Sequence, residues 1–375
     1  MFENVVRPEI RALKPYVPGR SIDEIREEYG LEHVVKMASN ENPLGVSNLV
    51  KEALGRHADT VFRYPTGGNP RLVRALAEHW KTDPARIVVG NGSDEIIDML
   101  VRMLAVAGRD NVVCFRPCFS LYPIQSLIQG VEIRRQPVNA DFSFDFDKLL
   151  GLVDENTRLV FVTTPDNPSG FCPRPDDVKV LAQRLPQNCL LVIDEAYMDF
   201  APAENESEAD WSLFKRGDLP DNACVIRTFS KSYGLAGLRI GVGILPCELA
   251  SYYWRARLPF SVNILAEEAV LAALEDKAFR ELTLKTVREG RELLQKGLAD
   301  LSCTVLPSRA NFLMFMPPKS LSADSLYKGL LERGIIVRAL ASYDLPEYIR
   351  VSIGNEEENR LFLQETAKIL AGSAK

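Results

Sequence analysis

The sequence contains little histidine, no long apolar run and no excess of basic residues. Histidine occurs at His33, His57 and His79, none of them in a motif typical of a catalytic base, so we expect chemistry that does not use histidine. No apolar run approaches the ~20 residues that a membrane-spanning helix needs. Lys and Arg number 45 against 51 Asp and Glu, and the net charge of −6 argues against a general nucleic-acid binder, which needs a basic surface.

Cysteine is present, but its pattern excludes two kinds of structure. The count is odd and no Cys-x-x-Cys occurs, so neither a disulfide framework nor a metal site is predicted. Residues 1–8 lack a charged-then-apolar signal pattern, which favours a cytoplasmic protein. The seven cysteines are Cys114, Cys118, Cys172, Cys189, Cys224, Cys247 and Cys303.

Apolar runs alternate with helical periods between residues 70 and 245. Within the runs, polar and apolar residues do not alternate, as expected of strands covered on both faces of a mainly parallel sheet. We therefore predict an α/β fold with a mainly parallel, mixed sheet sandwiched by helices. The predicted strands are 86–89, 111–115, 159–163, 190–193, 223–226 and 240–244.

A different pattern begins near residue 262 and indicates a smaller α+β domain. A long helical stretch over 263–301 precedes three short strand candidates and two further helices. At about 150 residues per domain, the length of 375 residues suits two or three domains. We predict an N-terminal arm with part of the small domain (1–45), a large domain (46–262) and a small C-terminal domain (263–375).

Unusual polar residues lie just past the ends of four predicted strands. These clusters are 90–95, 165–168, 194–197 and 230–231. In open α/β sheets, ligands bind beyond the carboxyl ends of the strands. The four clusters therefore predict one shared site.

The first cluster suits a phosphate group. Gly92, Ser93 and Asp94 open a predicted helix, whose free N–H groups and positive dipole end attract anions. The same residues are also ordinary helix caps, so both interpretations stay open. Glu95 stands where a dinucleotide-binding fingerprint requires its third glycine, which argues against a Rossmann dehydrogenase.

The clusters at 194–197 and 230–231 also carry groups that could bind a ligand. Asp194 ends an apolar strand and could pair with a protonated ring nitrogen, or form an internal salt bridge. Lys231 also follows a buried strand, where desolvation lowers the pKa of an amine and makes it nucleophilic. Thr228, Ser230 and Arg239 supply hydroxyls and a guanidinium for a phosphate. A surface Ser-Lys turn is the alternative.

Together, Asn167-Pro168, Asp194-x-x-Tyr197 and Ser230-Lys231 with Arg239 resemble the fold-type I aminotransferases, which use pyridoxal phosphate. The resemblance extends over essentially the whole chain. It implies that Lys231 is catalytic and binds the cofactor covalently, that Asp194 pairs with its ring nitrogen, and that Tyr197 and Asn167 bind its ring oxygen. The implied phosphate-binding residues are Gly92, Ser93, Asp94, Thr228, Ser230 and Arg239. Phe119 would stack on the ring, where many relatives have tyrosine.

The resemblance also implies a homodimer with active sites at the interface. Arg63-Tyr64-Pro65 resembles the loop that reaches the neighbouring subunit's cofactor phosphate, and residues 257–263 resemble a second loop near the partner's site. Arg350 matches the arginine that binds a substrate α-carboxylate with two hydrogen bonds.

Within the family, the chain is most similar to the histidinol-phosphate aminotransferases. Three features carry this similarity: 13–19 with Tyr16; 38–45 with Asn40, together with Arg63-Tyr64-Pro65; and 334–338 with Arg338, which matches an arginine that contacts the substrate phosphate in that subgroup. The implied reaction converts L-histidinol phosphate and 2-oxoglutarate to imidazole acetol phosphate and L-glutamate in histidine biosynthesis. The Pro and Gly content of the N-terminal arm further suggests a lid over the substrate.

Three alternatives remain on the sequence alone. Specificity in this group depends on few residues, so the substrate could be an aromatic or another amino acid. A related lyase that decarboxylates a phosphorylated amino acid has the same fold. A non-catalytic transcription regulator with an aminotransferase-like part would need an N-terminal helix-turn-helix domain, for which residues 1–70 are too short and irregular.

Overall fold

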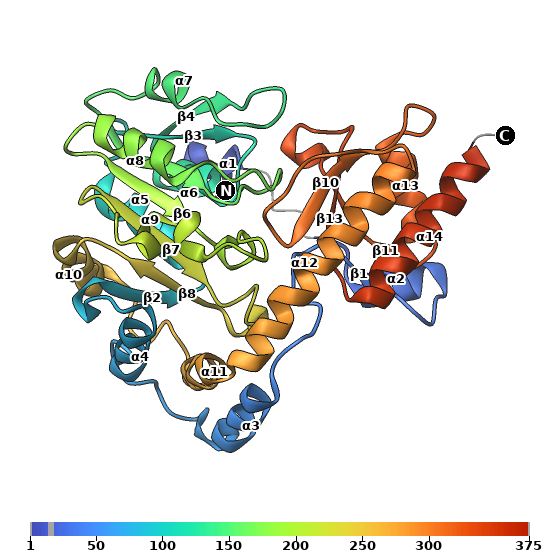
Figure 1. Ribbon diagram of the computed structural model, residues 1–375. Helices are drawn as coiled ribbons and strands as arrows, with labels where there is room; N and C mark the ends of the chain where they lie inside the picture. Colours follow the sequence, from blue (N-terminus) through green and yellow to red (C-terminus); the bar gives the residue numbers. More distant parts are fainter. Residues whose placement is uncertain (1, 14–18, 374–375) are drawn as a thin grey trace.

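The larger part of the molecule is built on a seven-stranded mixed sheet (Figure 1). The computed structural model describes residues 2–13 and 19–373. The strand order is β2-β8-β7-β6-β5-β3-β4; β8 runs antiparallel to both neighbours, and the other neighbouring pairs are parallel. The strands are β2 (Ile87–Asn91), β3 (Asn111–Arg116), β4 (Glu132–Pro137), β5 (Thr157–Thr163), β6 (Leu190–Asp194), β7 (Ala223–Thr228) and β8 (Ile240–Ile244).

These strands confirm the predicted α/β class, because all six predicted runs form strands of this sheet. The sequence prediction missed β4. This strand lies at the edge of the sheet, and its residues, among them Glu132, Arg134 and Arg135, are exposed or half-buried. An edge strand needs no continuous apolar run, so the pattern that reveals buried strands is absent from it.

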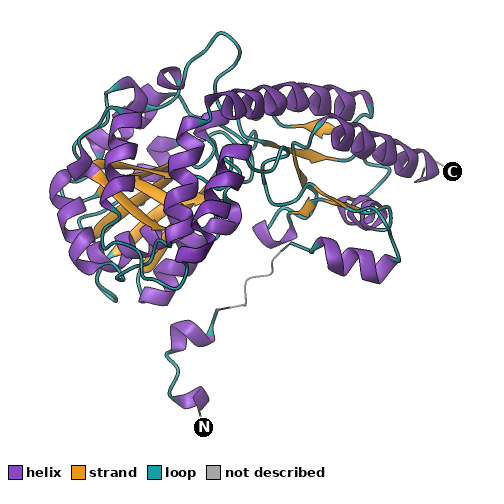
Figure 2. Ribbon diagram, turned by 90° about the horizontal axis from the view of Figure 1, so that it is seen from below, coloured by secondary structure: helices purple, strands orange, loops and turns teal. Residues whose placement is uncertain are grey.

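Helices cover both faces of the sheet, as Figure 2 shows. Alternate strand residues point to opposite faces: Val89 and Val160 join one core cluster, while Val88 and Phe161 join the other. The first face carries α3 (Asn48–His57), α4 (Pro70–Trp80), α7 (Phe146–Leu150), α8 (Pro175–Arg184), α9 (Leu213–Arg216) and α11 (Ile264–Glu275). The second face carries α5 (Ser93–Leu104), α6 (Leu121–Gln129) and α10 (Cys247–Ala256).

The smaller part combines residues from both ends of the chain. A four-stranded antiparallel sheet has the order β12-β13-β10-β9, and β1 pairs in parallel with β11. The strands are β1 (Val35–Lys36), β9 (Thr304–Val305), β10 (Phe312–Met316), β11 (Ile335–Ile336), β12 (Arg338–Ala339) and β13 (Ile349–Ser352). The helices are α2 (Ile22–Tyr29), α12 (Lys277–Asp300), α13 (Ala323–Leu331) and α14 (Glu356–Ser373).

The helical stretch expected over 263–301 is divided into two helices at Asp276. The Asp276 side chain accepts a hydrogen bond from the Phe279 backbone N–H at 3.0 Å, so it caps α12 instead of continuing α11. α11 packs on α3 beside the large sheet, and α12 runs from there along the smaller part (Figure 1). The two helices therefore connect the two parts of the molecule.

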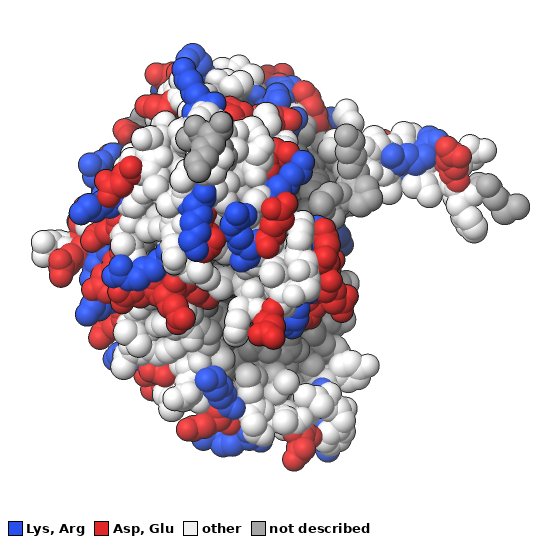
Figure 3. Space-filling model, turned by 90° about the vertical axis from the view of Figure 1, so that its right-hand side faces the viewer, with Lys and Arg blue, Asp and Glu red and all other residues white. Residues whose placement is uncertain are grey.

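The remaining elements are short. α1 (Pro8–Arg11) contacts α6, and the Arg7 guanidinium donates to the Ile128 carbonyl oxygen. On the face seen in Figure 3, acidic and basic side chains are interspersed. Among residues 2–13 and 19–373, no helix has the length and apolarity that a membrane crossing demands. The 3₁₀ helices are Phe2–Asn4, Ala58–Thr60, Pro84–Arg86, Met198–Phe200, Glu208–Asp210, Ala236–Leu238 and Ala341–Tyr343.

Candidate active site

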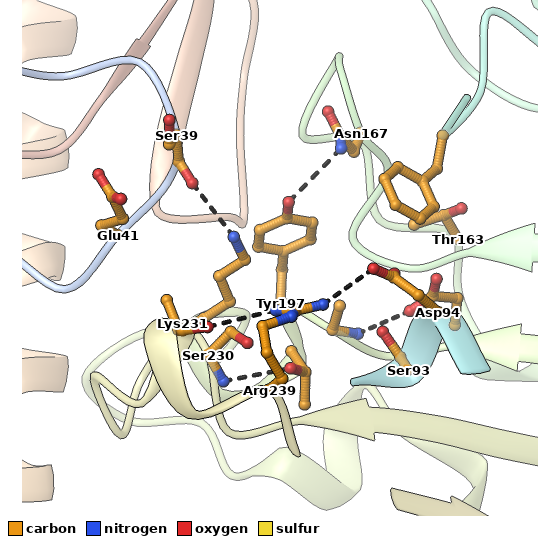
Figure 4. Close-up of a pocket in the computed structure, with 15 residues that line it drawn as sticks. Ser39, Glu41, Ser93, Asp94, Thr163, Asn167, Tyr197, Ser230, Lys231 and Arg239 are labelled. Carbon is orange, nitrogen blue, oxygen red and sulfur yellow. Dashed lines mark hydrogen bonds and ion pairs between the residues drawn. The ribbon is translucent and has the colours of Figure 1, made fainter. Parts of the chain in front are cut away.

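A cavity of about 260 Å³ lies where β5, β6 and β7 end, beside the N-terminus of α5 (Figure 4). It brings together residues of all four clusters that the sequence places past strand ends. Ten predicted cofactor residues line it: Ser93, Asp94, Phe119, Asn167, Asp194, Tyr197, Thr228, Ser230, Lys231 and Arg239. The cavity therefore joins an amine, a carboxylate, hydroxyls and a guanidinium in one small volume.

Lys231 extends its amine across the cavity toward the N-terminal segment. Its Nζ donates to the Ser39 carbonyl oxygen at 3.1 Å and lies 5.8 Å from the centroid of the Tyr197 ring. Desolvation, together with the positive charge of Arg350, lowers the pKa of Lys231 to about 8. About one-tenth of the amine is therefore neutral, and nucleophilic, at pH 7.

Asp194 is the buried carboxylate at the end of β6, and two donors hold it. Its Oδ1 accepts from the Ala196 backbone N–H at 3.0 Å, and its Oδ2 accepts from the Tyr122 hydroxyl at 2.7 Å. The Tyr122 hydroxyl also lies 2.8 Å from the Thr163 hydroxyl. Burial raises the pKa of Asp194 to about 6, and the Tyr122 hydrogen bond opposes that rise. A cationic N–H group in the cavity would stabilise the ionised form further.

The third region of the cavity is an anion cradle at the start of α5. Gly92 precedes the helix with a φ of +77°, and a Cβ added there would lie 2.5 Å from Nη2 of Arg239. Glycine is thus required for the arginine to approach the helix N-terminus. Arg239 forms an ion pair of 2.9 Å with Asp94. The free N–H groups of the helix, the hydroxyls of Ser93, Thr228 and Ser230 and this guanidinium together suit a phosphate.

A buried hydrogen-bond network joins the two parts of the molecule at Tyr197. The Tyr197 hydroxyl oxygen accepts from Nδ2 of Asn40 at 3.1 Å and from Nδ2 of Asn167 at 3.4 Å. Burial raises the pKa of Tyr197 to about 12, so its hydroxyl stays protonated and can donate to a ligand. Arg350, on β13, donates to Oδ1 of Asn167 and, at 2.9 Å, to the Ala38 carbonyl oxygen.

Five other predicted residues among those described do not line this cavity, and two of them, Asn40 and Arg350, belong to the network at Tyr197. Arg338 lies opposite Arg350 in the β12–β13 pairing, and its Nη1 is 3.6 Å from the Cβ position at Gly19. Tyr64 is 81% exposed and stacks on Phe260 with ring centroids 5.1 Å apart. Gly92 lies just behind Arg239, as described above. Tyr16 lies outside the described residues.

Sequence reasoning missed four polar residues of the site. Ser39 and Glu41 line the cavity and flank Asn40, which the early motif did single out. Thr163 ends β5 immediately before the 165–168 cluster, so the rule of strand ends could have found it. Tyr122 had no such signal, because it lies on the buried side of a helix, where a tyrosine resembles ordinary core.

Comparison with known proteins identifies the family. Residues 32–365 match the model of the family "Aminotransferase class I and II". The chain is 56% identical over 365 residues to a histidinol-phosphate aminotransferase of Nitratidesulfovibrio vulgaris, covering 97% of this chain and 96% of the relative. It is 38% identical to the Shouchella clausii protein of the same name, covering 98% and 97% of the two chains.

Solved structures agree with the sequence comparison. The crystal structure of histidinol-phosphate aminotransferase from Sinorhizobium meliloti in complex with pyridoxal-5'-phosphate superimposes with a TM-score of 0.86 at 28% identity, covering 98% of both chains. The family match covers most of the sequence, and the cavity holds the lysine, aspartate and anion cradle that the resemblance implied. This chain belongs to the class I and II aminotransferases.

Proposed function

We propose that this enzyme transfers the amino group of L-histidinol phosphate to 2-oxoglutarate in histidine biosynthesis, giving imidazole acetol phosphate and L-glutamate. Aminotransferase activity follows from the family. The observation that carries the substrate assignment is the 56% identity, over 97% of the chain, to a protein named for this reaction. Arg338 lies on β12, close to Gly19 of the N-terminal segment, where it could bind a second anionic group of the substrate.

The donor set of the cavity fits pyridoxal phosphate, the cofactor of this family. We propose that Lys231 binds its aldehyde, Asp194 its ring nitrogen, and Tyr197 with Asn167 its ring oxygen, while Phe119 stacks on the ring. The cradle of Gly92, Ser93, Asp94, Thr228, Ser230 and Arg239 would hold its phosphate. When bound, the cofactor supplies an electron sink for the carbon that carries the amino group.

The protein's own residues perform the proton transfers and the positioning. Lys231, with a pKa of about 8, can take a proton from the substrate carbon and return it, because its amine is partly neutral at working pH. Asp194, held ionised by Tyr122 and the Ala196 N–H, would favour the protonated form of the cofactor's ring nitrogen. Asn40 and Asn167 orient the Tyr197 hydroxyl.

Two arginines of the smaller part are placed to bind the anionic groups of the substrates. We propose that Arg350 binds the α-carboxylate of 2-oxoglutarate; its guanidinium is buried above the Phe312 ring and already holds Asn167. Arg338 and Tyr16 would bind the phosphate of histidinol phosphate, and Arg338 a carboxylate of 2-oxoglutarate. Asn40 completes the proposed substrate set.

We further propose a cytoplasmic homodimer. Each chain would consist of an N-terminal arm with part of the small domain (1–45), a large domain (46–262) and a small C-terminal domain (263–375), whose first helix, α11, packs on the large domain. Exposed apolar side chains support an interface around the two predicted loops: Phe62 is 75% exposed, Leu258 64% and Phe260 44%. Tyr64 lies among them, as expected if it reaches the neighbouring subunit's cofactor phosphate. The seven free cysteines suit a reducing compartment.

A set of half-reactions tests the proposal. The protein is loaded with pyridoxal phosphate, and its visible absorbance is followed after separate additions of L-histidinol phosphate, L-phenylalanine and L-glutamate. We expect histidinol phosphate and glutamate each to convert the bound cofactor to its amine form. Conversion by phenylalanine without conversion by histidinol phosphate would move the enzyme to the aromatic group. Carbon dioxide release from a phosphorylated amino acid, added separately and without glutamate, would indicate the lyase.

A further inference from the structure

Two cysteines lie side by side next to the cofactor cavity. Cys114 is fully buried in β3, and Cys118 is half-buried in the loop between β3 and α6. Their Sγ atoms are 3.7 Å apart. We propose that this pair is a redox modification site, at which a hydroperoxide converts the two thiols to a disulfide and thereby moves Phe119 within the cavity.

The geometry determines which side must move. A disulfide needs its sulfur atoms about 2.05 Å apart, so the pair has to close by about 1.7 Å. Cys114 is held between two strands, pairing with Arg135 of β4 and Phe161 of β5. Residues 117–120 lie outside any helix or strand and are all half-buried. Closing the distance between the two sulfur atoms therefore requires the loop of residues 117–120, which carries Phe119, to move.

The accessible thiol reacts first. The pKa of the Cys114 thiol is raised well above its ordinary value by the adjacent Cys118 sulfur and by burial, so Cys114 is a poor initial nucleophile. The Cys118 thiol attacks the hydroperoxide, giving a sulfenic acid and one alcohol or water molecule. The Cys114 thiol then attacks the sulfenic sulfur, the S–S bond forms and water leaves. Two thiols are oxidised by two electrons, and one hydroperoxide is reduced.

The consequence for the cavity follows from the contacts of Phe119. Its ring packs edge-on against Tyr122, with centroids 5.7 Å apart, and Tyr122 donates to Asp194. A shift of residues 117–120 thus disturbs both the proposed stacking surface and the residue that holds Asp194. Since this step rests on the proposed function, we expect the disulfide to weaken pyridoxal phosphate binding several-fold.

Peptide mapping tests the modification independently of any activity. The cofactor-free protein is treated with hydrogen peroxide, remaining thiols are blocked with N-ethylmaleimide, and the protein is digested with trypsin. Because Pro117 protects the bond after Arg116, both cysteines fall in one peptide, residues 110–134. We expect this peptide to lose about 2 Da, the two thiol hydrogens, and to escape blocking. Added oxygen on the peptide, or two blocked thiols at a peroxide dose that oxidises the exposed Cys247, would overturn the proposal.

Matched variants test the disulfide and its effect on cofactor binding separately. Cys114→Ser and Cys118→Ser should each abolish the loss of mass, whereas Cys247→Ser should retain it. Peroxide should weaken pyridoxal phosphate binding to the wild type, with recovery under dithiothreitol, but leave Cys118→Ser unaffected. A disulfide without any change in cofactor affinity would overturn the link to Phe119. Absence of cofactor binding in the reduced protein would instead reject the proposed function and leave the peptide result intact.

Discussion

At the residue scale, the least expected component of the site is the Tyr122 hydroxyl. Asp194 is buried, and an ionised carboxylate in that position needs hydrogen-bond donors to remain charged. Tyr122 supplies one donor and the Ala196 N–H the other. A helix residue that resembles ordinary core therefore helps to keep Asp194 ionised, and so able to pair with a positively charged ring nitrogen.

Replacing Tyr122 with phenylalanine should weaken cofactor binding. Hydrogen bonds to charged groups contribute about 1.5–3 kcal/mol, so we expect the dissociation constant for pyridoxal phosphate to rise about 10-fold or more. The Asp194 pKa should rise further above about 6, so the visible spectrum of the bound cofactor should change with pH over a higher range. Tyr253→Phe is the matched control, since Tyr253 is equally buried and donates to the Val89 carbonyl oxygen at 3.3 Å. Equal effects in both variants would assign the loss to packing.

The lowered pKa of Lys231 predicts how cofactor capture depends on pH. The environment shifts this pKa downward, from 10.5 to about 8, so the folded protein favours the neutral amine, which is the form that attacks an aldehyde. The stability linked to this neutral form is full above pH 10.5 and is lost as the pH falls through about 8. The neutral fraction rises from about one-tenth at pH 7 to about nine-tenths at pH 9, so the capture rate should rise about tenfold. Stopped-flow absorbance measures it, with Lys231→Ala as the control. A rate that still climbs steeply above pH 10 would contradict this interpretation.

The spacing of polar residues after the strands placed most of the cavity residues in one site. Residues that come together only through tertiary packing could not be predicted in this way. Asp194 and Lys231 were predictable because each follows a continuous apolar strand, and strand ends meet at one edge of a parallel sheet. The contact of Arg350 with Asn167 joins residues 183 positions apart, one on β13 and the other in the turn after β5, so its geometry is not encoded in any local pattern. The same holds for Tyr122, whose role arises from tertiary packing.

At the element scale, the buried strands, including the edge strand β2, were predictable, and the exposed edge strand β4 was not. β5, β6 and β7 are apolar on both sides because helices cover both, whereas β4 is half exposed and carries charged residues. The division of 263–301 into α11 and α12 depends on Asp276, a single capping residue within a long helical pattern. Strand positions thus follow from burial, while helix ends depend on individual side chains.

The contact between β8 and the start of α5 gives a prediction at this scale. A Cβ added at Gly241 would lie 2.1 Å from the Ser93 backbone nitrogen and 2.4 Å from the Gly92 carbonyl carbon. Backbone atoms cannot yield as a flexible side chain can, so Gly241→Ala should displace the anion cradle. We expect the free energy of unfolding to fall by about 1–3 kcal/mol, or more, measured by denaturant titration of the cofactor-free protein.

The matched control for this prediction is Gly237→Ala. Nothing lies within 4 Å of a Cβ added at Gly237, and its φ is not positive, so this variant should keep both its stability and its cofactor affinity. Equal stability of the two variants would mean that β8 and α5 can separate without cost. That result would argue against a rigid cradle formed by these elements.

At the scale of the whole molecule, one residue proposed to bind the cofactor, Tyr64, lies away from the cavity of its own chain. Tyr64 is well exposed and stacked on Phe260, outside the cavity that holds Lys231. If Tyr64 serves the neighbouring subunit's site, the exposed apolar side chains around it are an interface that a second copy covers. Replacing Tyr64 in one chain should then lower the cofactor affinity and activity of the other chain's site.

A hybrid dimer tests this directly. Lys231→Ala should fold but lose turnover, and Tyr64→Ala should retain little cofactor. In a dimer with one chain of each variant, one site combines both defects, while the other combines an intact Lys231 with an intact Tyr64 from the opposite chain. Co-expression with two affinity tags and purification through both should therefore yield about half the wild-type activity per dimer, although each parent homodimer has almost none. If each site were complete within its own chain, the hybrid would have no intact site and its activity would stay at the level of the parents. Restored activity thus requires that the two chains share their sites.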